Sequence, residues 1–228
     1  MSKYRHEFKY LCSENDILCI QFRIAPLMQI DSHIDETMMY TIRSLYFDTY
    51  NNGCYMDNIN GVEPREKFRI RIYNADDSFI RLELKRKEHG MTQKLSCTLT
   101  REQCVRIIEG KLLSPYETDN ALYRKFCILQ RTHLLRPKII VEYDRIPYIY
   151  KNGNVRATFD RNVRSSSQFE GFFEERIPTR SVMQGGQHIM EVKFDEYIPD
   201  FIHHAIQTSH LQRTAVSKYC LCRKYYLR

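Results

Sequence analysis

The sequence predicts an α+β fold in which an antiparallel β-barrel or tunnel carries helices on its outside. Eight segments have the alternating, β-branched and aromatic character of strands, whereas five have helical character. The two kinds follow one another in mixed order rather than as a regular β-α-β repeat, which favours an antiparallel sheet. With 228 residues, 43% of them hydrophobic, the chain suits one domain over 1–228 with a core of its own.

The strand candidates share runs of alternating polar and apolar residues bounded by turn residues. They cover residues 3–11, 39–49, 66–74, 78–88, 92–98, 138–149, 154–164 and 187–195. Gly185-Gly186 predicts a turn before the last strand, and Ser165-Ser166-Ser167 predicts a loop.

The helix candidates begin at residues that commonly stand at helix starts. Ser13 and Thr100 are good N-caps, and Pro199 suits a first helical turn. The expected helices cover residues 13–29, 100–109, 117–132, 198–208 and 216–226.

The overall charge indicates an anionic partner without identifying it. The formal net charge is +7, from 35 Lys and Arg against 28 Asp and Glu. The sequence contains no apolar run of membrane-spanning length and no secretory leader, so we expect a cytoplasmic protein. Eight cysteines without a C-x-x-C pair indicate reduced thiols rather than a zinc site.

Charged residues gather on one face of several predicted strands, because neighbouring side chains of a strand point to opposite faces. The charged pairs of this kind are Glu7-x-Lys9, Arg69-x-Arg71, Glu83-x-Lys85 and Glu191-x-Lys193. A half-exposed sheet with cross-strand ion pairs would explain any one of these strands. If the sheet closes, however, the charged faces meet in an interior and the apolar faces look outward towards the helices. Folding alone does not favour such an interior, which therefore indicates a ligand.

The residue types of this interior point to phosphate chemistry. Arg and Lys form charge-assisted hydrogen bonds to phosphate oxygens, and interleaved carboxylates are hard oxygen ligands for Mg²⁺ or Mn²⁺. A metal held between carboxylates and a triphosphate is typical of phosphoryl transfer. Nucleic acid is not an expected partner, because the outward faces of the strands are predicted to be apolar.

Six motifs in order resemble the VTC domain, the polyphosphate polymerase domain of the vacuolar transporter chaperone complex and its bacterial relatives. They are Glu7-x-Lys9, Leu45-Tyr46-Phe47-Asp48-Thr49, Lys67-Phe68-Arg69-Ile70-Arg71, Leu82-Glu83-Leu84-Lys85, Met190-Glu191-Val192-Lys193 and Ser217-Lys218-Tyr219. The resemblance covers about residues 4–221 and places the chain among the triphosphate tunnel metalloenzymes, as a free-standing prokaryotic type. Members of the CYTH branch of that superfamily carry a Glu-x-Glu-x-Lys motif in the first strand. This sequence has Arg5 at the position of the first Glu and so resembles the VTC branch more.

The resemblance implies transfer of the γ-phosphate of ATP, or of another nucleoside triphosphate, to growing inorganic polyphosphate with Mn²⁺ or Mg²⁺ as cofactor. A triphosphatase or nucleotide hydrolase in the same tunnel is one alternative. A non-catalytic module that binds polyphosphate or inositol phosphates is another. A membrane-protein partner encoded elsewhere is compatible with this reading.

The resemblance also implies roles for individual residues. The catalytic phosphate-gripping residues would be Arg69, Arg71, Lys85, Arg145, Lys193 and Lys218. Further phosphate contacts would come from Lys9, Lys87, Lys94, Tyr143, Arg156 and Ser217. The metal would be held by Glu191, with Glu7, Glu83 and Asp160 supporting it or orienting the basic residues.

Four positions leave alternatives open. Ala215 stands where the family pattern has a basic residue, and Arg213 is the candidate substitute. Arg156 and Asp160 share a predicted strand face, so a structural ion pair between them is the alternative to their functional roles. Lys94 is equally well explained as a solvated strand lysine.

Overall fold

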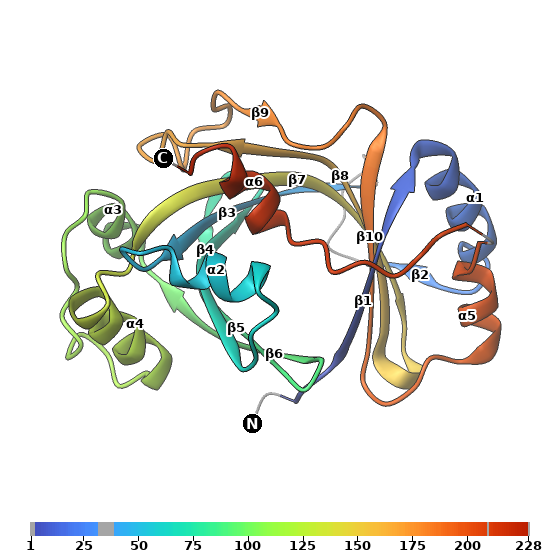
Figure 1. The fold of residues 1–228 in the computed structure, drawn as a ribbon, viewed down its shortest axis with the longest axis horizontal. Coiled ribbons are helices and arrows are strands. Elements are labelled where there is room, and N and C mark those ends of the chain that lie inside the picture. The colour runs from blue at the N-terminus through green and yellow to red at the C-terminus, as the bar shows by residue number, and fades with distance from the viewer. Residues whose placement is uncertain (1–2, 32–38, 209, 228) are drawn as a thin grey trace.

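In the computed structural model, one antiparallel sheet curls around a central space and carries its helices on the outside (Figure 1). The structure describes residues 3–31, 39–208 and 210–227. The other positions of the domain predicted over 1–228 lie outside the described residues.

All eight predicted strands are present with small shifts of their ends. They are β1 (His6–Ser13), β3 (Tyr40–Asp48), β4 (Arg65–Tyr73), β5 (Asp76–Glu88), β6 (Met91–Leu99), β7 (Arg136–Tyr150), β8 (Val155–Ser166) and β10 (Gln187–Phe194). Two short strands were not predicted: β2 (Gln29–Ile30) pairs with β7, and β9 (Arg180–Ser181) pairs with β8. The loop predicted at Ser165 and Ser166 is wrong, because both residues continue β8 and pair with β7.

The strand order is β1-β10-β8-β7-β3-β4-β5-β6, and every pair is antiparallel. The two ends of this order meet at Arg5 and Thr92, where each backbone N–H donates to the other residue's carbonyl at 2.9 Å. Farther along β1, Thr214 N–H donates to the carbonyl of Lys9 at 2.9 Å, so the segment before the last helix runs beside β1. The predicted barrel or tunnel is therefore confirmed.

Six α-helices are described, together with a short 3₁₀ turn, η1 (Asn152–Asn154). They are α1 (Glu14–Ile24), α2 (Gly53–Ile59), α3 (Arg101–Ile108), α4 (Ala121–Thr132), α5 (Asp200–Ile206) and α6 (Lys218–Lys224). Ser13 and Thr100 cap their helices as predicted, each within a capping box. The first helix is shorter than expected, because Pro26 disfavours continuation beyond Ile24.

Helix α2 was not predicted from the sequence. It follows Asn52, which lies in the left-handed region at φ 58°, and its first N–H groups are satisfied from outside the helix. The Asp48 carboxylate accepts from the N–H of Cys54 at 2.8 Å and of Tyr55 at 3.0 Å. This long-range cap carries no local sequence signature, which explains why the helix was missed.

Two of the three apolar clusters lie between the outer face of the sheet and the helices. The outward residues of β4 and β5, such as Ile70 and Leu82, pack with α3 and α4. Those of β1, β8 and β10, such as Phe159 and Val192, pack with α1 and α5.

On β1, β4, β5 and β10 the apolar faces point outward as predicted, so their charged faces line the inside of the tunnel. On β3 and β7 the pattern differs, because the apolar residues Ile42 and Val141 share the strand faces of the lumen residues Tyr46 and Tyr143.

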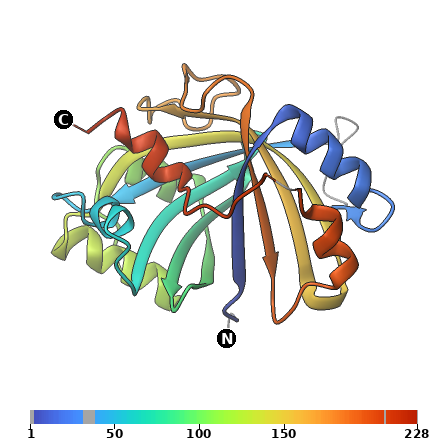
Figure 2. The same cartoon turned by 45° about the vertical axis from the view of Figure 1, so that its right-hand side comes forward.

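Helices α2 and α6 and the segment before α6 lie together at one end of the tunnel (Figures 1 and 2). In the described part of the chain, no helix has the length and apolar character needed to cross a membrane.

Candidate functional site

The centre of the tunnel holds a strongly cationic cavity. Eight of the fourteen residues that line it are Lys or Arg, whereas two are acidic. The lining residues are Glu7, Lys9, Tyr46, Lys67, Arg69, Arg71, Lys85, Tyr143, Arg145, Glu191, Lys193, Ser217, Lys218 and Tyr219. They come from six strands and from α6, so closure of the sheet is what gathers them.

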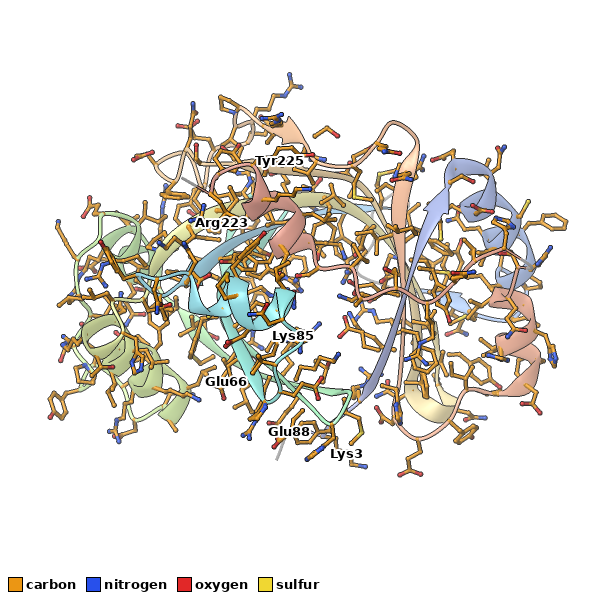
Figure 3. All side chains as sticks on the ribbon, in the orientation of Figure 1. Lys3, Glu66, Lys85, Glu88, Arg223 and Tyr225 are labelled. Atoms are coloured by element: carbon orange, nitrogen blue, oxygen red, sulfur yellow. The ribbon has the colours of Figure 1, made fainter. Side chains whose placement is uncertain are left out.

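The tunnel continues from this centre into two unequal mouths. The narrow mouth, beside α2 and the segment before α6, is a cavity of about 90 Å³ that includes Lys9, Lys67, Lys87 and Ser217. The wide mouth, at the other end, is a cavity of about 410 Å³ that shares six lining residues with the centre. Its other lining residues are Lys3, Arg5, His6, Tyr40, Tyr73, Thr92, Lys94, Asn154, Arg156 and Asp195. Lys85 on β5 borders the centre and both mouths (Figure 3).

Glu83 organises the basic residues on one wall of the tunnel. Its carboxylate lies 2.6 Å from Arg69, 3.1 Å from Lys94 and 3.8 Å from Arg71. Burial alone would raise the pKa of Glu83, but the charges of Arg71 and Arg69 hold it well below its usual value. Glu83 is thus ionised and fixes two arginines towards the lumen.

Asp160 and Glu191 form a second anionic centre on the opposite wall. Asp160 accepts both ends of the Arg145 guanidinium, at 2.6 and 2.7 Å. Lys218 lies between the two acids, 2.5 Å from Asp160 and 2.6 Å from Glu191. Lys193 pairs with Glu191 at 2.9 Å. The side chains of Lys218, Asp160 and Glu191 are buried, so these ion pairs are shielded from solvent.

Glu7 contacts residues of both walls near Arg5 and Thr92, where the two ends of the sheet meet. It accepts from Lys85 at 2.6 Å and from the Thr92 hydroxyl at 3.1 Å. Lys9 lies 3.7 Å from Glu7 and 3.9 Å from Glu191, so it stands between these two carboxylates. Glu7 and Glu191 are therefore neighbours across the β1–β10 pair.

Burial is the main cause of the lowered pKa values of three lysines in the lumen, whose lining has more basic than acidic side chains. Burial, assisted by the charge of Lys9, lowers the pKa of Lys85 from 10.5 to about 7 despite its contact with Glu7. Burial also lowers the pKa of Lys67 and of Lys193. Lys218 is the exception, because Asp160 and Glu191 outweigh the effect of burial and raise its pKa. A bound polyanion would relieve this excess of positive charge.

Tyrosine hydroxyl groups complete the polar lining. Arg69 donates to the Tyr46 hydroxyl at 2.8 Å, and Arg71 donates to the Tyr143 hydroxyl at 3.3 Å. The charges of Arg69 and Arg71 lower the pKa of Tyr46 although burial alone would raise it. These contacts hold the two guanidinium groups in fixed directions.

The structure brings most of the predicted site residues together around the lumen, whereas three basic residues, Lys87, Lys94 and Arg156, lie at its mouths. Lys87 borders the narrow mouth and lies 3.3 Å from Glu63. Arg156 lines the wide mouth and donates to Asp31 at 2.7 Å. The alternative of an Arg156–Asp160 ion pair is wrong, because Asp160 pairs with Arg145 and Lys218 instead.

Arg213, the candidate substitute for a basic residue at position 215, does not point into the lumen. The Arg213 guanidinium lies over the Phe8 ring at 3.6 Å, and Phe8 belongs to the outer face of β1. Ala215 itself lines the narrow mouth.

Lys67, Tyr46 and Tyr219 were missed as site residues. Lys67 donates to the Ser217 hydroxyl at 3.2 Å and lies over the Tyr219 ring at 5.3 Å. Its position two residues before Arg69 was the available signal, since residues i and i+2 share a strand face. Tyr46 lies between the apolar residues Leu45 and Phe47, so the strand pattern predicts a core residue and does not indicate that its hydroxyl faces the lumen.

The carboxylates fit a metal shared with a ligand rather than a metal held by the protein alone. Within residues 3–31, 39–208 and 210–227, no three His, Cys, Asp or Glu side chains gather as a metal site. Glu7 and Glu191 are neighbours and supply hard oxygens, which suits Mg²⁺ or Mn²⁺ bound by one or two carboxylates and by phosphate oxygens. All four carboxylates, those of Glu83 and Asp160 as well as those of Glu7 and Glu191, have cationic partners.

Solved structures share this fold at low sequence identity. The candidate adenylyl cyclase HpAC1 from Hippeastrum, described as having a dominant triphosphatase activity, has a TM-score of 0.56 and 15% identity, over 98% of this chain and 97% of that chain. A candidate adenylate cyclase from Bacillus halodurans has a TM-score of 0.51 and 16% identity, over 90% and 87%. One from Vibrio parahaemolyticus has a TM-score of 0.51 and 10% identity, over 97% and 98%.

The family comparison is more specific than these structural similarities. No curated protein matches the sequence significantly. The model of the VTC domain, however, matches residues 4–227, which is almost the whole chain. The cationic tunnel agrees with the triphosphate chemistry of that family, and this chain therefore belongs to the VTC domain family.

Proposed function

We propose that this protein is a metal-dependent polyphosphate polymerase that transfers the γ-phosphate of ATP, or of another nucleoside triphosphate, to a growing inorganic polyphosphate chain. The observation that carries the proposal is the excess of positive charge inside the tunnel. Buried charge without a partner destabilises a fold, so an anionic ligand is the natural complement of these side chains. The whole chain would act as one domain.

The proposed phosphate-binding groups follow from their place in the lumen. Arg69, Arg71, Lys85, Arg145, Lys193 and Lys218 would grip the donor phosphates and the transferred group. Lys9, Tyr143 and Ser217, with Lys87, Lys94 and Arg156 at the mouths, would extend the phosphate path. Charge-assisted hydrogen bonds from such groups stabilise a transferring phosphoryl group without a protein nucleophile.

Mn²⁺ or Mg²⁺ would be held by Glu191 together with Glu7. When bound, the metal supplies charge neutralisation on phosphate oxygens. Glu83 and Asp160 would keep Arg69, Arg71 and Arg145 oriented towards the substrate. We place the reaction in the cytoplasm, where ATP is available, with a membrane protein as a compatible partner and no role for nucleic acid.

A triphosphatase is the second candidate. HpAC1 shares the fold and is described with a dominant activity of that kind. The phosphate-binding groups would be the same, and water would replace the polyphosphate end as acceptor. A non-catalytic module for polyphosphate or inositol phosphates would use the same cationic lining without turnover.

One experiment separates the three readings. Purified protein is incubated with ATP and Mn²⁺, with and without a short polyphosphate primer, and the products are resolved on a gel. We expect long polyphosphate together with ADP. Free phosphate without polymer would support the triphosphatase instead. Absence of turnover, with strong stabilisation of the fold by tripolyphosphate, would support the binding module.

A further inference from the structure

We infer that Tyr40 and Tyr73 form a nucleoside subsite in the wide mouth and thereby set the direction in which the donor enters the tunnel. This inference rests on the proposed function, because it takes a nucleoside triphosphate to be the ligand of the lumen.

The two rings form an aromatic surface inside the wide mouth. Tyr40 on β3 and Tyr73 on β4 both line that mouth, and their ring centroids lie 5.6 Å apart in an edge-to-face arrangement. Tyr40 is buried, whereas Tyr73 is partly exposed. A partly exposed ring that is supported by a buried one offers a flat face on which a base can stack.

Polar contacts hold this surface in place. Arg156 donates to the Tyr40 hydroxyl at 3.2 Å and to Asp31 at 2.7 Å. The charge of Arg71 lowers the pKa of Tyr73 against the effect of burial. The aromatic surface is therefore adjacent to a guanidinium group that also lines the centre of the lumen.

The narrow mouth does not offer such a surface. Its cavity is about 90 Å³ against about 410 Å³ for the wide mouth, and the described residues that line it include no aromatic ring. It presents Lys9, Lys67, Lys87 and the Ser217 hydroxyl instead. A polyphosphate chain suits this mouth, whereas a nucleoside needs both more room and a ring to stack on.

The geometry of phosphoryl transfer links these two observations. With the base on Tyr73 and the phosphates on Arg71 and Arg69, the γ-phosphate lies in the central cavity. A terminal oxygen of the acceptor chain then forms a bond to the γ-phosphorus, while the bond from that phosphorus to the bridging β–γ oxygen breaks and ADP leaves. Because the attacking and leaving oxygens are in line, the acceptor must arrive from the narrow mouth.

The test compares ATP with inorganic tripolyphosphate, which has the phosphates but no nucleoside. Affinities are measured by isothermal titration calorimetry for the wild type, Tyr73→Ala, Tyr73→Phe and Phe79→Ala. Phe79 is an exposed aromatic residue on β5 and serves as the matched control. We expect Tyr73→Ala to weaken ATP binding about tenfold and to leave tripolyphosphate within twofold, because stacking on one aromatic ring is lost. Tyr73→Phe should retain most of the ATP affinity.

A second measurement needs no substitution. The fluorescence of 2-aminopurine riboside triphosphate should be quenched on binding to the wild-type protein, and ATP should displace it. An equal loss of ATP and tripolyphosphate affinity in Tyr73→Ala, or binding of the fluorescent nucleotide without quenching, would overturn the subsite and leave the proposed function standing. Failure of the wild type to bind either ligand would overturn both.

Discussion

The Nζ of Lys218, the first residue of α6, lies 2.6 Å from Oε1 of Glu191 on β10. This contact joins the C-terminal helix to the wall of the tunnel, and Asp160 strengthens it from β8 at 2.5 Å. The cationic lumen is therefore assembled by residues from both ends of the chain, and its charge balance depends on a few buried carboxylates.

Replacing Glu191 by glutamine should destabilise the ligand-free protein. Lys193, which is partly exposed, would lose its close anionic partner, and Lys218 would lose one of two because Asp160 remains. The loss of unfolding free energy should therefore lie below the value of about 3–5 kcal/mol for a fully unpaired buried charge. Urea denaturation measures this change, and Glu109→Gln, on an exposed carboxylate, is the control. Tripolyphosphate should stabilise the variant more than the wild type. Activity of Glu191→Gln that still depends on Mn²⁺ as in the wild type would argue against Glu191 as the metal ligand.

Replacing Arg69 by alanine should abolish turnover with the fold intact. Glu83 keeps Lys94 and Arg71 as neighbours, so its charge stays compensated, while a phosphate-binding guanidinium is lost. Removal of one such group lowers the rate about 10²–10³-fold in other enzymes. The control is the rate of Arg86→Ala. Arg86 lies away from the lumen, where its guanidinium pairs with the Glu88 carboxylate at 3.0 Å. If activity falls only in proportion to unfolded protein, seen by circular dichroism, Arg69 has a structural role.

Ligand binding near neutral pH should take up protons. Lys85 has a pKa of about 7 in the free protein, and a bound triphosphate would raise it, as it would the lowered pKa values of Lys67 and Lys193. Calorimetric titration with tripolyphosphate at pH 7.5, in two buffers of different ionisation enthalpy, counts these protons. The uptake should be smaller in Lys85→Met, and an equal uptake in both proteins would exclude Lys85 as its source.

The same lysine should make stability depend on pH. Its pKa in the folded protein is about 7 and lies below its ordinary value of 10.5, so the unfolded chain binds more protons between these two values. The contribution of Lys85 to the unfolding free energy therefore rises with pH from about 7 to about 10.5. Denaturant titrations across this range should show a shallower rise for Lys85→Met than for the wild type. Parallel curves would contradict the lowered pKa.

Asp48 should be among the most sensitive positions outside the lumen. Its buried carboxylate accepts from the N–H of Cys54 at 2.8 Å and from the Tyr219 hydroxyl, which ties α2 and α6 to β3. We expect Asp48→Ala to cost about 2–4 kcal/mol of unfolding free energy, since several buried donors lose their acceptor. Asp119→Ala, at a fully exposed aspartate, should change stability by less than about 1 kcal/mol. Similar losses in the two variants would contradict this role of Asp48.

The sequence allowed the strands and the composition of the lumen to be predicted, because both depend on the period-two alternation of side chains. Lys193 and Arg71 face inward for the same reason that Val192 and Ile70 face outward. The pairing of charges could not be predicted in this way. Asp160 pairs with Arg145 on a neighbouring strand rather than with Arg156 on its own, and this partner follows from the β7–β8 register.

Elements that depend on contacts between residues far apart in the chain could not be predicted from the sequence either. Helix α2 depends on Asp48 and has no local cap from a side chain at Asn52. The unequal sizes of the two mouths depend on where α2 and the segment before α6 cross the tunnel end, which no local pattern encodes.

The closure of the sheet between Arg5 and Thr92 also bears on how the protein is made. β1 pairs along its length with β10, which the ribosome releases some 180 residues later, and α6 follows only after β10. The sheet from β3 to β6 can form on the nascent chain, but the ring of basic residues stays open until the C-terminal segment emerges. A chain truncated before β10 would thus lack Glu191, Lys193 and Lys218 from the lining of the lumen.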